Sequence, residues 1–234
     1  AETGGQNAMI VDSSALAEQV VTDVLASAFD SAGQRCSALR VLCVQEDVAD
    51  RLIEMLLGAM AEWRIASPDR LAVDVGPVID AEALAGIQKH VEGMRAKGRR
   101  VHQLGACDAD ALGCGTFMLP TVIELDHLSE LKREVFGPVL HVLRYQREDL
   151  DALLAQINAT GYGLTMGLHT RIDETIDRVL KASHAGNVYV NRNIVGAVVG
   201  VQPFGGEGLS GTGPKAGGPL YLYRLLSRRP ADVM

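Results

Sequence analysis

One cysteine of this sequence lies in a setting that favours nucleophilic chemistry. Cys36 belongs to the segment Gly33-Gln34-Arg35-Cys36-Ser37, which joins a helical pattern to an apolar run. A thiol beside an arginine and near backbone amides can have a lowered pKa, and the thiolate is the nucleophilic form. The alternative is a buried, inert thiol, which is the commoner state of cysteines outside disulfides. We assign Cys43, Cys107 and Cys114 to that inert class.

A carboxylate and a glycine-rich loop are the other two candidates. Glu2 precedes Gly4 and Gly5, where the backbone can approach a ligand closely, although a solvated turn would look the same. The segment 203–213 (PFGGEGLSGTG) can present Phe204 to a pocket, the alternative being an aromatic ring in the core. Its glycines do not form a dinucleotide-binding fingerprint, because no strand-to-helix context surrounds them.

Composition narrows the class of protein. The chain has 234 residues, a formal net charge of −7 and 47% hydrophobic residues, which is ordinary globular usage. The acidic balance argues against nucleic acid as a partner of this segment. No uninterrupted apolar run reaches the roughly 18 residues that a membrane span needs. The cysteines form two C-x6-C pairs, a spacing that matches no common zinc site, so we expect no metal and a reducing cytosol.

Hydrophobic periodicity predicts strands that alternate with helices. Helical spacing predicts helices over 15–29, 48–63, 81–97, 150–158 and 173–183. Short apolar runs predict strands over 39–44, 101–104, 139–145, 164–169 and 187–190, and Pro120 makes 117–125 an edge strand or an extended segment. The alternation indicates an α/β fold with a mainly parallel twisted sheet and flanking helices. We expect one domain over 1–204 and a glycine-rich loop and tail over 205–234.

Taken together, five motifs resemble the aldehyde dehydrogenase superfamily. They are, in chain order, ETGGQN, GQRCS, EVFGPV, NVYVNR and PFGGEGLSGTG, and they cover essentially the whole chain. In that family the general base and the nucleophile are separated as Glu2 and Cys36 are, by 34 residues. The segments KREVFGPVLHVLRY and GTGPKAGGP further resemble the glutamate-γ-semialdehyde dehydrogenase part of bifunctional bacterial enzymes of proline catabolism. The resemblance implies the catalytic-domain fold of this family.

The resemblance also implies a reaction, the NAD-dependent oxidation of L-glutamate γ-semialdehyde to L-glutamate. Cys36 would attack the aldehyde carbon, and the resulting thiohemiacetal would lose hydride to the nicotinamide and become a thioester. Glu2 would be the general base for hydrolysis of that thioester. The backbone N–H of Cys36 would donate one hydrogen bond to the oxyanion.

Binding residues follow from the same resemblance. Glu134 and Phe136 match the residues that hold the nicotinamide ribose and pack on the nicotinamide ring. In the glutamate-γ-semialdehyde branch, the substrate-binding positions match Ser37, Gly196, Ala197 and Phe204. The backbone at Gly196 and Ala197 would form a nest of N–H groups for the substrate carboxylate.

The resemblance places several parts of the full enzyme outside this chain. We expect an upstream nucleotide-binding domain, which supplies the asparagine of the oxyanion hole, and a proline dehydrogenase half that holds FAD. The rest of the same polypeptide is therefore an expected partner, together with the aldehyde substrate and a second copy in a homo-oligomer. We expect a cytoplasmic protein, and association of the full-length protein with the inner membrane face stays open.

Two other functions remain. The first is an inactive scaffold or oligomer-forming unit that lacks an NAD-binding domain. The second is a dehydrogenase for another small aldehyde, which the anchor segment 194–201 would decide.

Overall fold

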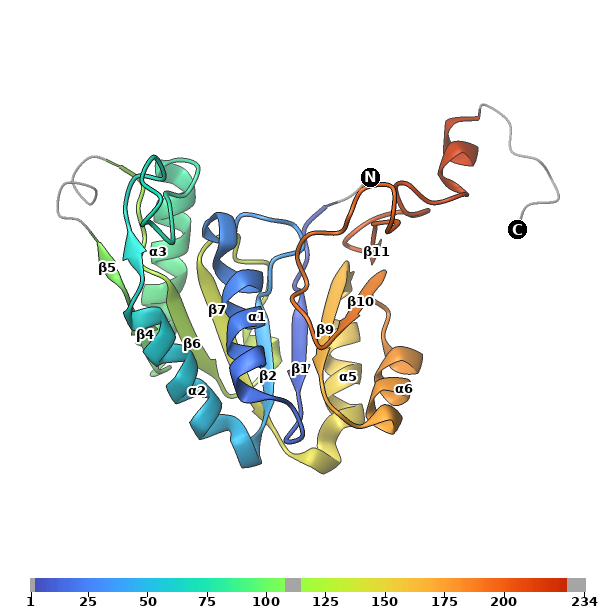
Figure 1. Cartoon of the computed structure of the whole chain (residues 1–234), viewed down its shortest axis with the longest axis horizontal. Helices are drawn as coiled ribbons and strands as arrows, with labels where there is room; N and C mark the ends of the chain where they lie inside the picture. The colour runs from blue at the N-terminus through green and yellow to red at the C-terminus, as the bar shows by residue number, and fades with distance from the viewer. Residues whose placement is uncertain (1–2, 108–114, 227–234) are drawn as a thin grey trace.

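A seven-stranded sheet forms the centre of the molecule, in the order β10-β9-β1-β2-β7-β6-β4 (Figure 1). The computed structural model describes residues 3–107 and 115–226. The strands are β1 (Ala8–Val11), β2 (Val41–Gln45), β4 (Val101–Gln103), β6 (Thr121–Leu125), β7 (Val139–Tyr145), β9 (Thr165–His169) and β10 (Asn187–Val190). All neighbouring strands are parallel except β4 and β6. This arrangement confirms the α/β fold with a mainly parallel sheet.

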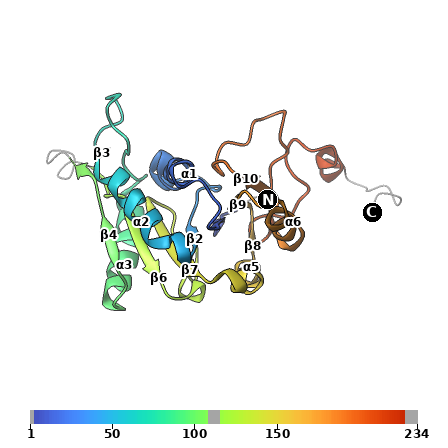
Figure 2. The same cartoon turned by 60° about the horizontal axis from the view of Figure 1, so that its bottom comes forward.

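Helices cover both faces of the sheet. The helices α1 (Ala17–Phe29) and α2 (Glu46–Ala61) pack on one face, and α3 (Ala81–Ala96), α5 (Leu150–Ala159) and α6 (Asp173–Ala182) pack on the other. Figure 2 shows α1 and α2 on the opposite side of the sheet from α3 and α5. Side chains along β7 point alternately to the two faces of the sheet. Leu140 and Val142 pack in the core with α1 and α2, while Val139 and Leu143 pack in the core with α3, α5 and α6.

Short strands attach the remaining segments. β3 (Arg64–Ile65) pairs with β5 (Ala106–Cys107), and β11 (Glu207–Gly208) pairs with β8 (Tyr162–Gly163). The second pair fastens the glycine-rich segment beside β9. Beyond it, a short 3-10 helix at Tyr221–Leu225 stands away from the body of the molecule (Figure 1). No helix in the described part of the chain is long and apolar enough to cross a membrane.

Two features of the sheet differ from the expectation. β1 was not expected, yet it lies between β2 and β9. Its four residues are all buried on both faces, so the strand has no polar alternation that periodicity could detect. The expectation of an edge strand at Pro120 was wrong, because β6 lies between β7 and β4. Pro120 precedes the strand, so its missing N–H removes no ladder bond, and its carbonyl accepts a hydrogen bond from the Leu104 N–H at 3.1 Å.

Candidate active site

The amino ends of the parallel strands form one edge of the sheet, the amino edge, and their carboxyl ends form the carboxyl edge. Asn7, Arg40 and Thr165 stand at the amino ends of β1, β2 and β9. The Cys36 turn (residues 33–38) leads toward β2, and the Glu134 loop (residues 133–138) leads directly into β7. Because β2 and β7 are neighbouring parallel strands, both segments reach the amino edge side by side.

Buried side chains hold the backbone of the Cys36 turn. Asn7 is 3% exposed, and its Nδ2 donates hydrogen bonds to the carbonyls of Cys36 at 2.7 Å and Ala38 at 2.8 Å. Its Oδ1 accepts from the Thr165 N–H at 3.1 Å. The Thr165 hydroxyl donates to the intervening carbonyl of Ser37 at 3.3 Å. Three successive carbonyls of the turn are therefore fixed by two residues of neighbouring strands.

Cys36 itself is exposed on this fixed turn. Cys43, by contrast, lies in the core of β2 with 0% exposure, and burial raises the pKa of its thiol to about 12. At neutral pH the Cys43 thiol is protonated and inaccessible, which confirms its assignment as inert. The two cysteines differ in their access to solvent. Only an exposed thiol can lose its proton to water and reach an electrophile.

The carboxylate of Glu134 is held from two sides. Its Oε1 accepts hydrogen bonds from Arg40 Nε at 3.1 Å and Nη2 at 2.9 Å, and its Oε2 accepts from the Gly5 N–H at 3.0 Å. The side chain of Glu134 is 12% exposed and that of Arg40 is 1% exposed. At Gly4 a Cβ atom would lie 1.9 Å from Glu134 Oε2, so a larger residue there would displace this carboxylate from its present position.

Phe136 presents a flat apolar surface beside Glu134. Its side chain is 45% exposed, and the Arg40 guanidinium carbon lies 5.1 Å from the ring centre. A cavity of about 500 Å³ adjoins this loop, and its lining includes Glu134, Phe136 and His90 of α3. The loop thus offers an accessible ring and a carboxylate next to open space.

The glycine-rich loop (residues 203–213) closes on the same edge. The Thr3 N–H donates to the Ser210 carbonyl at 3.0 Å, and the fully buried Ser210 hydroxyl accepts from the Gly163 N–H at 3.1 Å. A Cβ at Gly186 would lie 1.9 Å from the Gly205 carbonyl oxygen, which shows how closely the loop packs before β10. The amino-terminal segment and the glycine-rich loop are therefore joined at the amino edge.

The remaining predicted residues lie in different settings. Phe204 is half-buried in the glycine-rich loop, where its backbone exchanges two hydrogen bonds with Ala216. Ser37 is buried within the Cys36 turn. Gly196 has φ +79°, and a Cβ there would meet nothing within 4 Å, while Ala197 is half-buried. Glu2 lies outside the described residues. The roles given to all these residues stay predictions.

Sequence reasoning missed Asn7, Arg40 and Thr165 as parts of the site. One signal could have identified Arg40, since it is a charged residue inside the apolar run of 39–44. A cation in a buried strand needs an anionic partner, so Arg40 indicated that a carboxylate from elsewhere in the chain packs beside it. Asn7 carried only the weaker signal of its place in the ETGGQN motif.

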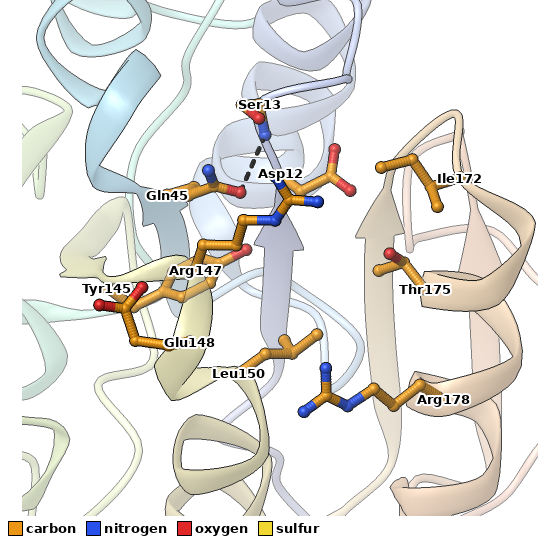
Figure 3. Close-up of a pocket in the computed structure, with 10 residues that line it drawn as sticks. All are labelled: Asp12, Ser13, Gln45, Tyr145, Arg147, Glu148, Leu150, Ile172, Thr175 and Arg178. Atoms are coloured by element: carbon orange, nitrogen blue, oxygen red, sulfur yellow. Dashed lines mark hydrogen bonds between the residues drawn. The ribbon is translucent and has the colours of Figure 1, made fainter.

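The carboxyl edge also has a cavity, of about 380 Å³ (Figure 3). It is lined by Asp12, Ser13, Gln45, Tyr145, Arg147, Glu148, Leu150, Ile172, Thr175 and Arg178. Its polar groups are largely engaged with the protein. The Asp12 carboxylate accepts from the N–H and the hydroxyl of Ser14, Gln45 Oε1 accepts from the Ser13 N–H at 3.2 Å, and Arg178 forms an ion pair with Asp151 at 2.6 Å. These contacts give polar groups at the ends of strands and helices a partner within the protein.

Metal chemistry has no candidate in residues 3–107 and 115–226. No group of three or more histidine, cysteine, aspartate or glutamate side chains there could hold an ion.

Comparison with known proteins gives a consistent result. The model of the aldehyde dehydrogenase family matches residues 1–229. The chain is 70% identical over 237 residues to the bifunctional protein PutA of Klebsiella aerogenes, covering 100% of this chain and 18% of that protein. It is 36% identical over 224 residues to a 1-pyrroline-5-carboxylate dehydrogenase of Bacillus cereus, covering 95% of this chain and 42% of that protein.

A solved structure agrees with the sequence comparison. The crystal structure of a bifunctional proline utilization A (PutA) protein superposes with a TM-score of 0.89 at 56% identity, covering 94% of this chain and 22% of that chain. The chain therefore spans about a fifth of the length of these PutA relatives. The match of the family model along nearly the whole chain, together with the identity to PutA, shows that this chain belongs to the aldehyde dehydrogenase family.

Proposed function

We propose that this chain supplies the nucleophile of an enzyme that oxidises L-glutamate γ-semialdehyde to L-glutamate with NAD, as part of a longer polypeptide. The observation that carries the proposal is the exposed Cys36 on a turn held by buried side chains, at the edge that also presents Glu134 and Phe136. The relatives named PutA and 1-pyrroline-5-carboxylate dehydrogenase support this substrate.

Cys36 carries the covalent step of the proposed reaction. Its thiolate attacks the aldehyde carbon and forms a thiohemiacetal, whose oxyanion accepts a hydrogen bond from the Cys36 N–H. The Arg35 carbonyl shares a peptide plane with this N–H and accepts a hydrogen bond from Arg40 Nη2 at 3.1 Å, which keeps the N–H in place without reorganisation during the reaction. After loss of hydride the remaining thioester is hydrolysed by water, with Glu2 as the general base. We assign the second oxyanion donor to the upstream domain.

Glu134 and Phe136 fit the nicotinamide riboside end of NAD. Glu134 Oε1 accepts twice from Arg40, whereas Oε2 accepts only from the Gly5 N–H and keeps a further lone pair for a ribose hydroxyl. The exposed Phe136 ring can pack against a flat heterocycle. When bound, NAD supplies the hydride acceptor. We assign FAD to the proline dehydrogenase half, outside this chain.

The end of the substrate that bears the carboxylate is assigned to Ser37 and the backbone at Gly196 and Ala197, and the aliphatic stem to Phe204. The open space above Gly196 supports this assignment, because N–H groups there are not screened by a side chain. The rest of the polypeptide completes the nucleotide site. A homo-oligomer and a cytoplasmic location are further parts of the proposal.

The experiment compares two thiols in the full-length protein. Cys36→Ala is expected to lower the rate of NADH formation by more than about 1,000-fold, because the covalent step has no substitute. The affinity for NAD should not change. Cys43→Ala is the matched control, and it should keep the wild-type rate because that thiol is in the core. A Cys36→Ala protein with near-full turnover would refute the proposal.

The substrate class has its own measurement. Wild-type turnover of glutamate γ-semialdehyde should exceed that of an unfunctionalised aliphatic aldehyde, since only the first has a carboxylate for the Gly196 backbone. Equal turnover of the two would assign the enzyme to another small aldehyde. The isolated 234-residue chain should neither bind NAD tightly nor form NADH, because in this proposal the rest of the polypeptide completes the nucleotide site.

A further inference from the structure

Arg40 occupies the centre of the amino edge. It is 1% exposed, and its guanidinium contacts four residues besides the ring of Phe136. Nε and Nη2 donate to Glu134 Oε1, Nη1 donates to the carbonyl of Gly33 at 2.7 Å, and Nη2 donates to that of Arg35 at 3.1 Å. Nη1 also donates to the Gly137 carbonyl at 3.3 Å.

These partners belong to two different segments. Gly33 and Arg35 lie in the Cys36 turn, whereas Glu134 and Gly137 lie in the Glu134 loop. Arg40 and Glu134 are 94 positions apart in the chain, so no local structure holds the two segments together. A planar fork with five donors can serve both at once, which a lysine ammonium on its flexible stem cannot do. Charge-assisted hydrogen bonds of this kind are also the stronger class.

We infer that Arg40 is a positioning residue of the proposed dehydrogenase, fixing the Cys36 turn and the Glu134 loop relative to each other. The inference rests on the proposed function for the identity of the reaction. It assigns to one buried side chain the alignment between the nucleophile and the surface that receives the nicotinamide. An error of about 1 Å in such an alignment can cost roughly 100-fold in rate.

The charge of Arg40 has a second effect, separate from its hydrogen bonds. Burial lowers the pKa of Arg40, while the negative charges of Glu134 and Cys36 oppose this shift. Attraction is mutual, so the guanidinium favours the thiolate form of Cys36. Position and charge can therefore be separated by substitution, because lysine keeps the charge and loses the fork.

Two histidines near Arg40, His141 and His90, do not change their charge in the pH range of the alkylation measurement. The Arg40 carbonyl lies 3.0 Å from His141 Nδ1, and His141 Nε2 lies 2.9 Å from His90 Nε2. Burial lowers the pKa of His141 to about 3 and also lowers that of His90. Both rings are neutral between about pH 7 and 9, where thiols are alkylated.

The test measures NAD kinetics and thiol alkylation in the full-length protein. Arg40→Met should lower kcat/KM for NAD by about 100-fold and move the pH profile of Cys36 alkylation by iodoacetamide to higher pH. Arg40→Lys should leave the alkylation profile close to wild type but raise KM for NAD by about 10-fold, since the charge stays and the fork is lost. Cys43 is buried and should not react.

Arg99→Met is the matched control. Arg99 also pairs with two carboxylates, those of Asp126 and Glu130, and its side chain is 22% exposed. Its loss should change neither the kinetics nor the alkylation profile. All measurements are made below the unfolding temperature of each variant, which circular dichroism determines.

Two results would overturn the inference. One is a folded Arg40→Met protein with wild-type NAD kinetics, and the other is an Arg40→Lys protein indistinguishable from wild type in KM for NAD. Should Arg40→Met fail to fold, Arg40→Lys decides the question of position by itself. A wild-type protein that forms no NADH would instead refute the proposed function, and the alkylation profiles would still report on the charge of Arg40.

Discussion

The two edges of the central sheet are built from similar polar residues but differ in what those residues leave available. At the carboxyl edge, Asp12 binds Ser14, Gln45 binds Ser13, and Arg178 is paired with Asp151. At the amino edge, buried side chains also bind one another, but they leave a thiol and an aromatic ring exposed above them. At the carboxyl edge the polar groups bind one another and stabilise the fold. At the amino edge they hold the backbone beneath an exposed thiol and an exposed ring.

The position of the candidate site differs from the one that is usual for open α/β sheets. Ligands of open α/β sheets usually bind outside the carboxyl ends of the strands. In this chain the residues assigned to chemistry precede their strands, because the Cys36 turn comes before β2 and the Glu134 loop comes before β7. Location in the fold is therefore a weaker guide than the state of the individual side chains.

The largest difference between the edges should appear at Asn7 and Ser14. Asn7→Ala leaves the carbonyls of Cys36 and Ala38 and the N–H of Thr165 without their hydrogen-bond partner. It should therefore lower the free energy of unfolding by about 3 kcal/mol. Because the Cys36 turn loses its support, NADH formation in the full-length protein should fall by about 100-fold. Denaturant unfolding and steady-state kinetics measure the two effects.

Ser14→Ala is the counterpart at the carboxyl edge. Asp12 keeps hydrogen bonds from the Ser14 N–H and the Thr170 hydroxyl, so the stability should fall by about 1 kcal/mol and the rate should not change. Equal losses of rate in the two variants would mean that the edges do not differ in function.

A second prediction concerns the packing of the glycine-rich loop at the amino edge. Gly186→Ala places a Cβ against the Gly205 carbonyl oxygen, a backbone atom that cannot rotate away. It should therefore lower the free energy of unfolding by about 2 kcal/mol. Gly58→Ala, in α2 with nothing within 4 Å of the new Cβ, should instead raise it by about 0.5–1 kcal/mol. A stabilised Gly186→Ala protein would show that the loop is not packed there.

The third prediction, the smallest when the pH changes by one unit, is a pH dependence from His141, whose Nδ1 contacts the Arg40 carbonyl. Its pKa falls from 6.5 to about 3 on folding, mainly through burial, so the unfolded chain binds more protons between these values. The stability that the neutral ring contributes is present above pH 6.5 and is lost as the pH falls toward 3. The slope should reach about 1 kcal/mol per pH unit.

The slope is measured by urea unfolding at several pH values. His141→Gln should flatten it, whereas substitution of the exposed His184 by Gln should leave it unchanged. A slope that survives in His141→Gln would assign the acid sensitivity to other groups.

Local patterns predicted most elements within a few residues. The strands at Val139–Tyr145 and Asn187–Val190 begin and end where they were expected, since short apolar runs bounded by turn residues mark buried strands. The helix expected over 15–29 begins at Ala17, and its N-cap residue, Leu16, makes no side-chain capping hydrogen bond. The central strand β1 escaped prediction, because four buried residues have no periodicity to read.

By itself, the sequence determined the family and most of the elements and marked Cys36 as the candidate nucleophile, because motifs and hydrophobic spacing are properties of neighbouring residues. Only the tertiary structure decided that Arg40 pairs with Glu134, 94 positions away, and that Asn7 holds the carbonyl of Cys36, 29 positions away. Such pairs form when parallel strands bring their amino ends to one edge. Local spacing does not encode them, since the distance between two residues in the folded chain depends on the order of the strands in the sheet.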